Sequence, residues 1–262
     1  YLTAGAILDD NSAPMLGTKG DRKVVNDPWT DARVVNSLTG LLNPSGPISE
    51  QYMYGSMKQG LGFSWFRDQT VIKHTTGTFS AGGAVAGANQ TGTSITVTAI
   101  TGTLKMGDIV VFDGVNAVNR VTKQTTGMQR QFVVTADVAG GGTVVGIYPA
   151  LVPAQNGSAV QYQTVDVSPA NGAAMSLVTN ASATYRKSLS YAPEAITMVT
   201  ADLFMPTKGV IESSRHQMDG VSMRSLSAYL PGTDQVADRL DVLFGSLMVR
   251  GEWTCVVADT IR

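Results

Sequence analysis

The stretch of sequence that decides the fold runs from Ser94 to Tyr148 and reads SITVTAITGTLKMGDIVVFDGVNAVNRVTKQTTGMQRQFVVTADVAGGGTVVGIY. In its first seven residues, apolar side chains alternate with Thr, as in a strand that buries one face. Val-rich runs follow at residues 109–112, 131–138 and 143–148, and they are separated by turns such as Gly107-Asp108 and Gly140-Gly141-Gly142. We therefore predict a small β barrel or sandwich at residues 93–165. We also expect the segment that contains its strands, residues 94–165, to fold on its own.

The residues just before this domain change in composition. Residues 75–93 read TTGTFSAGGAVAGANQTGT and are nearly uncharged and rich in Gly, which favours a linker over a regular element. The alternative, a phosphate-binding loop, is excluded because neither Gly-x-x-x-x-Gly-Lys-Ser/Thr nor Gly-x-Gly-x-x-Gly occurs in the chain. We predict an α+β region at residues 1–92, the inserted β domain at 93–165, and a β-rich return at 166–262.

Helix signals occur on the amino-terminal side. Asp27-Pro28 is a cap followed by Pro at the first helical position, and apolar residues then recur at helical spacing as far as Leu42. A second short helix is expected to begin at Ser49 and to end at Gly60, followed by a strand at 61–66. On the carboxyl-terminal side, residues 189–203, 221–230, 240–249 and 253–257 are expected to be extended.

The overall charge and the cysteine content exclude several classes of protein. The 262 residues include 19 Lys and Arg against 20 Asp and Glu, so no excess of positive charge is available to hold a nucleic acid. Cys255 is the only cysteine, which rules out an intrachain disulfide and favours folding in a reducing cytoplasm. No apolar run reaches the ~18–20 residues that cross a bilayer. Because Tyr1 is not an initiator Met, we expect the chain to begin in mid-protein.

The sequence contains no recognisable metal or nucleophile site. His74 and His216 are far apart and lack a partner at helical spacing, so each is expected to be a surface or hydrogen-bonded polar residue. Cys255 lies in an apolar stretch without a neighbouring His and is expected to be a buried small side chain. Trp29, Trp65 and Trp253 are expected in the core.

Paired carboxylates and a possible nucleophilic Ser also fail to make an active site. Asp9-Asp10 suits a turn, and Glu194 and Asp202 lie in no acid/base motif. Ser56 lacks the second Gly of a Gly-x-Ser-x-Gly elbow and is expected inside a helix. We therefore expect no catalytic, cofactor-binding or metal-binding residues, no cofactor, and no enzymatic activity.

Several segments, taken in order, resemble the coat proteins of short-tailed bacteriophages that carry an inserted β domain in an HK97-like fold. They are Leu2–Asn11, Ile48–Tyr52, Gly62–Gln69, Gly87–Gly92, Gly107–Asn119, Thr122–Gly127, Gln131–Val138, Ala195–Leu203, Asp219–Arg224 and Arg239–Gly245. Two stretches depart from the family pattern: YAPE at residues 191–194 and VRGE at residues 249–252. The family's amino-terminal arm, extended loop and spine helix would precede Tyr1.

The resemblance implies a major capsid protein of α+β fold, a structural subunit that self-assembles into the pentamers and hexamers of an icosahedral head. It also implies scaffolding and portal proteins as partners, a DNA genome enclosed without sequence-specific binding, no membrane association, and assembly in the cytoplasm of the bacterial host. A β-rich cell-surface adhesion module is the alternative, but it should show disulfides or acidic calcium loops. A hydrolase is a further alternative, and it would need a cleft with converging polar groups.

Overall fold

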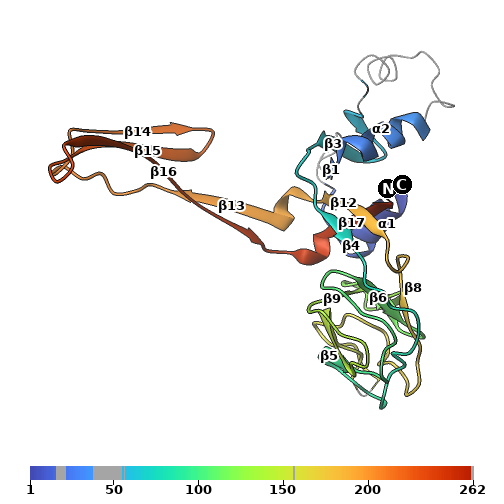
Figure 1. Ribbon diagram of the computed structural model, residues 1–262. Coiled ribbons are helices and arrows are strands. Elements are labelled where there is room, and N and C mark those ends of the chain that lie inside the picture. Colours follow the sequence, from blue (N-terminus) through green and yellow to red (C-terminus); the bar gives the residue numbers. More distant parts are fainter. Residues whose placement is uncertain (16–21, 38–54, 56, 156, 261–262) are drawn as a thin grey trace, which may run out of the picture. The chain divides into compact units, whose positions relative to one another are not determined.

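The structure, a computed structural model, describes residues 1–15, 22–37, 55, 57–155 and 157–260 (Figure 1). This part of the chain is mostly β, and its α-helices are α1 (Leu2–Asp10) and α2 (Pro28–Ser37). The chain forms two compact units: the first consists of Tyr1–Ala192 with Glu252–Arg262, and the second of Pro193–Gly251.

The first unit begins and ends in one mixed sheet. Its strands are β1 (Lys23–Asn26), β2 (Gln59–Gly60), β3 (Phe63–Arg67), β4 (Lys73–Thr75), β12 (Thr184–Tyr191) and β17 (Thr254–Thr260). The order is β17-β12-β1-β3-β2, β4 also pairs with β12, and β1 and β3 run parallel. Leu8 of α1 packs with Val24, Phe63 and Trp65 to form the apolar core beside this sheet.

A second core lies within residues 76–183. Its five-stranded sheet has the order β11-β6-β9-β10-β5 and contains β5 (Gly92–Thr96), β6 (Ile109–Phe112), β9 (Phe132–Val134), β10 (Val144–Leu151) and β11 (Met175–Leu177). A separate hairpin contains β7 (Asn116–Val118) and β8 (Thr125–Gln129). The rings of Phe112 and Phe132 pack at 5.7 Å, and the cluster extends from Val85 to Met175, beyond residues 93–165 on both sides.

The chain leaves the mixed sheet and returns to it at one place. β4 pairs antiparallel with the start of β12, with Thr75 opposite Thr184. Immediately beyond this pair, the Thr76 N–H donates to the carbonyl of Ala183 at 3.0 Å. We call the paired segments 73–77 and 182–186 the strap, because everything between them forms one β body.

The second unit is a four-stranded antiparallel sheet with the order β13-β16-β15-β14. Its strands are β13 (Ile196–Ala201), β14 (Glu212–Met218), β15 (Val221–Leu230) and β16 (Gln235–Met248), and the 3₁₀ helix η2 (Pro193–Ala195) precedes them. A second 3₁₀ helix, η3 (Gly251–Trp253), begins at the last residue of this unit and continues into the first unit. In Figure 1 these strands are drawn in orange to red.

Several predicted elements are confirmed: the helix that begins at Pro28, the strand at 109–112, and the strand at 221–230. The predicted strand at 189–203 is wrong in the middle, because Pro193 lacks an N–H for the ladder and opens η2. Gly60, which was expected to cap a helix, lies in β2 and pairs with Phe63 of β3. The predicted helix start at Ser49 and the stretch from Leu38 to Leu42 lie outside the described residues.

Two expectations near the amino terminus are corrected by the structure. Asp9-Asp10 was expected in a turn but forms the last turn of α1, and the chain turns at Asn11-Ser12 instead. Trp29 was expected in the core, yet its side chain is 69% exposed, whereas Trp65 is buried. The helical pattern around Trp29 predicts which residues share a face of α2, but not how far that face is covered.

Candidate functional site

His74 is a hydrogen-bonded structural residue, as predicted. It lies on β4, and its Nε2 stands 2.7 Å from Oδ1 of Asp108, whose side chain is fully buried. The other carboxylate oxygen of Asp108 accepts from the N–H groups of Gly77 and Lys105, at 3.1 and 2.8 Å. His216 is exposed on β14 in the second unit.

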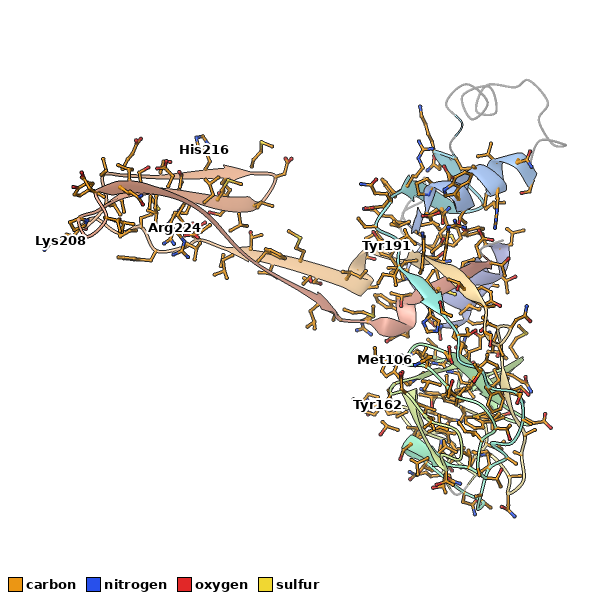
Figure 2. The ribbon with its side chains drawn as sticks, viewed as in Figure 1. Met106, Tyr162, Tyr191, Lys208, His216 and Arg224 are labelled. Carbon is orange, nitrogen blue, oxygen red and sulfur yellow. The ribbon has the colours of Figure 1, made fainter. Side chains whose placement is uncertain are left out.

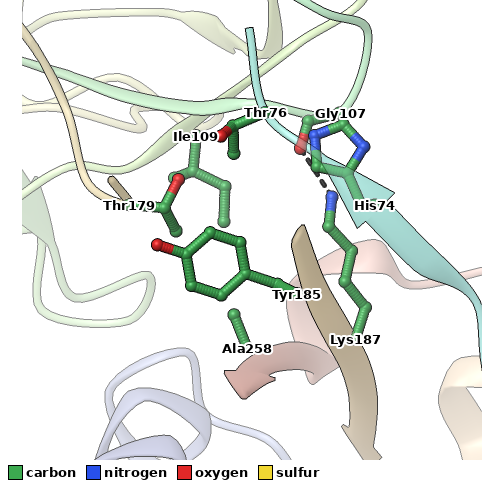
Figure 3. A pocket seen from close by; sticks show the side chains of 8 residues that line it. All are labelled: His74, Thr76, Gly107, Ile109, Thr179, Tyr185, Lys187 and Ala258. Atoms are coloured by element: carbon green, nitrogen blue, oxygen red, sulfur yellow. Dashed lines mark hydrogen bonds between the residues drawn. The ribbon is translucent and has the colours of Figure 1, made fainter. Parts of the chain in front are cut away.

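A small cavity lies beside His74 and the strap (Figure 3). Its lining residues are His74, Thr76, Gly107, Ile109, Thr179, Tyr185, Lys187 and Ala258. Lys187 crosses one side and donates from Nζ to the carbonyl of Gly107 at 2.6 Å, as the dashed line in Figure 3 marks. The cavity volume of about 10 Å³ has room for one water. Ligand pockets measure roughly 300–1,000 Å³, so this cavity is too small for a substrate.

The carboxylates and the thiol considered from the sequence have structural surroundings. Asp9 pairs with the buried Arg22 at 2.7 Å, and Asp202 pairs with Arg215 at 3.0 Å. Glu194 is exposed in η2, and Ser56 lies outside the described residues. Cys255 is half-buried on β17, and burial raises the pKa of its thiol, which keeps it protonated and weakly nucleophilic.

Among the residues that the structure describes, no group of three or more His, Cys, Asp or Glu side chains is placed to hold a metal ion. None of the helices in the same ranges is both long enough and apolar enough to cross a membrane.

The most unusual surface of the molecule is one face of the second unit's sheet. The register places Met223 opposite Val242, Tyr229 opposite Val236, and Met198 opposite Ser246, so their side chains share one side. Glu212, His216 and Asp238 lie on the same side, and we call its large hydrophobic residues the apolar face. They are Met198, Met218, Met223, Tyr229, Val236, Leu240, Val242, Phe244 and Met248. Each is 40–77% exposed, and an antiparallel sheet normally buries one face against another layer.

On the opposite side of the same sheet, charged side chains form ion pairs with one another. Arg224 pairs with Asp241, and both side chains are 13% exposed. Hydrogen bonds from Arg224 and then from Arg239 lower the pKa of Asp241, so it stays ionised. Arg215 also donates to the carbonyl of Leu203 at 2.7 Å, which fixes the chain after β13 over this side. Figure 2 shows Arg224 and His216 on opposite sides of the sheet.

The size of the apolar face matches that of a protein contact. Nine large side chains that are about half exposed present roughly 100 Å² each, which gives an area on the order of 900 Å². A typical stable interface buries about 800 Å² on each partner, and monomers rarely expose apolar patches larger than a few hundred Å². This face is therefore suited to be covered by protein.

A comparison with known families identifies the chain. The family model described as P22 coat protein, gene protein 5, matches residues 14–256. The chain belongs to the P22 coat protein family. It is a structural subunit of a phage capsid, and coat proteins of this family assemble with copies of themselves into the capsid of the virion. The adhesion-module and hydrolase alternatives are not favoured.

Among solved structures, the CUS-3 coat protein I-domain matches this coat protein with 28% sequence identity and a TM-score of 0.27. The match covers 43% of this chain and 100% of that one. No curated protein matches the chain.

The sequence did not single out the two features that matter most in this coat protein. The apolar face can be traced afterwards in the even-numbered residues of β16, where Val236, Leu240, Val242, Phe244 and Met248 are apolar and Asp238 and Ser246 interrupt the series. Because odd positions such as Leu243 and Leu247 are also apolar, the alternation is blurred. The contact between His74 and Asp108 has no local signal, since the two residues are 34 positions apart.

Proposed function

We propose that this coat protein is the repeating subunit of an icosahedral head of HK97-like, α+β architecture, arranged in pentamers and hexamers. The observation that supports this most directly is the apolar face, which the sheet of the second unit leaves exposed and does not cover itself. The other expected partners are scaffolding and portal proteins, with assembly in the host cytoplasm. The nearly balanced charge suits a shell that encloses DNA without gripping it. The protein acts by shape and contact, not by catalysis.

The proposed domain division keeps an inserted β domain between two parts of the capsid core, with residues 1–92 and 166–262 as the flanking parts. The pairing of β4 with β12 supports a wider insertion than residues 93–165, because the body it encloses runs from 76 to 183. The core residues Val85 and Met175 fall inside the wider limits and outside the narrower ones. We adopt 76–183 as the inserted domain.

The test is to place a charge on the apolar face of the complete coat protein. Leu240→Asp and Phe244→Asp replace side chains that are 71% and 63% exposed with a carboxylate, so the stability of the folded unit should change little. If assembly covers this face, a buried and unpaired charge will block it. We expect both variants to remain soluble subunits, with closed particles absent under negative-stain electron microscopy.

The matched control is Val121→Asp, a residue 74% exposed in the turn between β7 and β8. It introduces the same charge in place of an equally exposed apolar side chain outside the apolar face, and it should assemble normally. Far-UV circular dichroism checks that all variants are folded. Normal particles from Leu240→Asp and Phe244→Asp would contradict the proposal.

A further inference from the structure

The inserted domain contacts the mixed sheet through a buried joint at the strap. Asp108 accepts three hydrogen bonds there, from His74 of β4, from the Gly77 N–H next to β4, and from the Lys105 N–H of its own loop. On the partner strand, Lys187 donates to the carbonyl of Gly107. The loss of any of these hydrogen bonds would leave a buried carboxylate oxygen without a donor, which lowers the stability of the fold, so the three donors keep Asp108 in place.

The backbone of Gly107 allows this close approach. Its φ of +93° lies in the left-handed region, and a Cβ at this position would stand 3.2 Å from Lys187 Nζ and 3.4 Å from His74 Cε1. The strap adds the hydrogen bonds from the Thr76 N–H to Ala183 and from the Ser182 N–H to Gly77. This end of the inserted domain is therefore a persistent attachment.

A second attachment stands on the turn between β7 and β8 and has a different character. The Nδ2 of Asn119 donates to the carbonyl of Asp10 at the end of α1, at 3.1 Å, and Nη1 of Arg120 stands 2.8 Å from Oε1 of Glu252. The side chains of Arg120 and Glu252 are 40% and 19% exposed. We call these two contacts the clasp. Solvent-accessible pairs of this kind are weak and are screened by salt.

The charges around the clasp make Glu252 the group on which it depends. Burial lowers the pKa of Arg130, and the nearby charge of Arg120 lowers it further, while Tyr148 and Glu252 act in the opposite sense. Two guanidinium groups therefore lie close together, with Glu252 as a carboxylate near both. Without the charge of Glu252, the arginines would repel each other and Arg120 would lose its partner.

From these two unequal attachments we propose that the inserted domain is hinged: it turns about the buried strap, and the Arg120–Glu252 clasp holds it closed against α1 and η3. The hinge is the short strap, where the chain crosses between the domains only twice. The clasp lies at the other attachment and opens when its charges are removed or screened. The inserted domain thus has a closed position, in which both contacts of the clasp are made, and an open position, in which they are lost.

The test measures a distance across the hinge in the unassembled full-length protein. Spin labels at Trp29→Cys on α2 and Tyr162→Cys in the inserted domain, residues 69% and 71% exposed, are attached in a Cys255→Ala background. Pulsed electron paramagnetic resonance should give one narrow distance distribution for the parent protein. Glu252→Gln should broaden it about twofold or more, and so should about 1 M NaCl, because both remove the attraction.

Two further variants separate a hinge from a general loosening. Lys105→Gln removes a more exposed ion pair within the inserted domain, the one that Lys105 makes with Asp137 at 3.1 Å, and should leave the distribution narrow. The exchange Arg120→Glu with Glu252→Arg should restore most of the narrow distribution lost in Glu252→Gln. The proposal is overturned if Glu252→Gln keeps the parent distribution, or if Lys105→Gln broadens it equally.

Discussion

A fragment of residues 76–183 is expected to fold alone, whereas a fragment of residues 94–165 is expected to fail. The shorter fragment lacks Val85 and Met175, which are 1% and 4% exposed in the inserted domain's core. Burying each such side chain contributes about 1.5–3 kcal/mol, so roughly 3–6 kcal/mol is lost. It also lacks β11, which pairs with β6 and covers the edge that carries Phe112. A domain of about 110 residues has a total stability of only about 5–15 kcal/mol.

The assay compares the two fragments by amide dispersion in ¹⁵N–¹H correlation spectra and by thermal unfolding followed with circular dichroism. The longer fragment should show dispersed amides and one cooperative transition. The shorter one should give a collapsed spectrum with no transition, which revises the expectation drawn from the sequence. Dispersed amides and a similar melting temperature for residues 94–165 would refute the reasoning, since the flanking segments would then contribute little to the core.

Three other changes probe the remaining structure, each followed by thermal unfolding. Gly102→Ala should lower the free energy of unfolding by roughly 3 kcal/mol or more, because φ is +88° and the new Cβ would stand 2.1 Å from a backbone carbonyl oxygen. Gly127 also has a positive φ but faces open space, so Gly127→Ala should lower it by about 1–2 kcal/mol. Equal losses for the two variants would contradict this. Arg186→Met breaks the buried 2.7 Å ion pair with Asp27 and should lower the free energy of unfolding by about 3–5 kcal/mol, because it leaves the charge of Asp27 without its partner. An unchanged melting temperature would contradict this. Burial raises the pKa of Asp31 above its usual value, so the ionised carboxylate destabilises the fold at neutral pH, and this effect disappears in acid. Asp31→Asn should therefore raise the melting temperature at pH 7 but not near pH 3. The reverse pH dependence would contradict this.

The strands of this protein were predictable where one side chain in two is buried between clear turns. Residues 109–112 satisfy this condition, with Val110 and Phe112 buried, and they form β6 with the predicted bounds. Residues 221–230 form β15 with the predicted bounds although Ser222 is its one buried residue, because Gly220 turns the chain before it with a φ of +78°. Periodicity and turn residues are local properties, and they were sufficient for these elements.

Other features depend on contacts that no local pattern encodes. Helix α1 has Ala4 and Leu8 as its buried residues, so its apolar stripe is too short to stand out in the sequence. The limits of the inserted domain depend on the pairing of Thr75 with Thr184, more than a hundred positions apart. The apolar face could not be recognised because both sides of β16 carry apolar residues, and which side is covered depends on tertiary and quaternary contacts.

The adjacency of Thr75 and Thr184 also bears on how this coat protein can change over time or be engineered. The host sheet is interrupted between two residues that already face each other across a hydrogen-bonded ladder, so its register does not depend on the length or shape of what lies between them. Loops inside the insert can therefore lengthen, or a foreign module can replace it for display on a particle, without shifting the strands of the host.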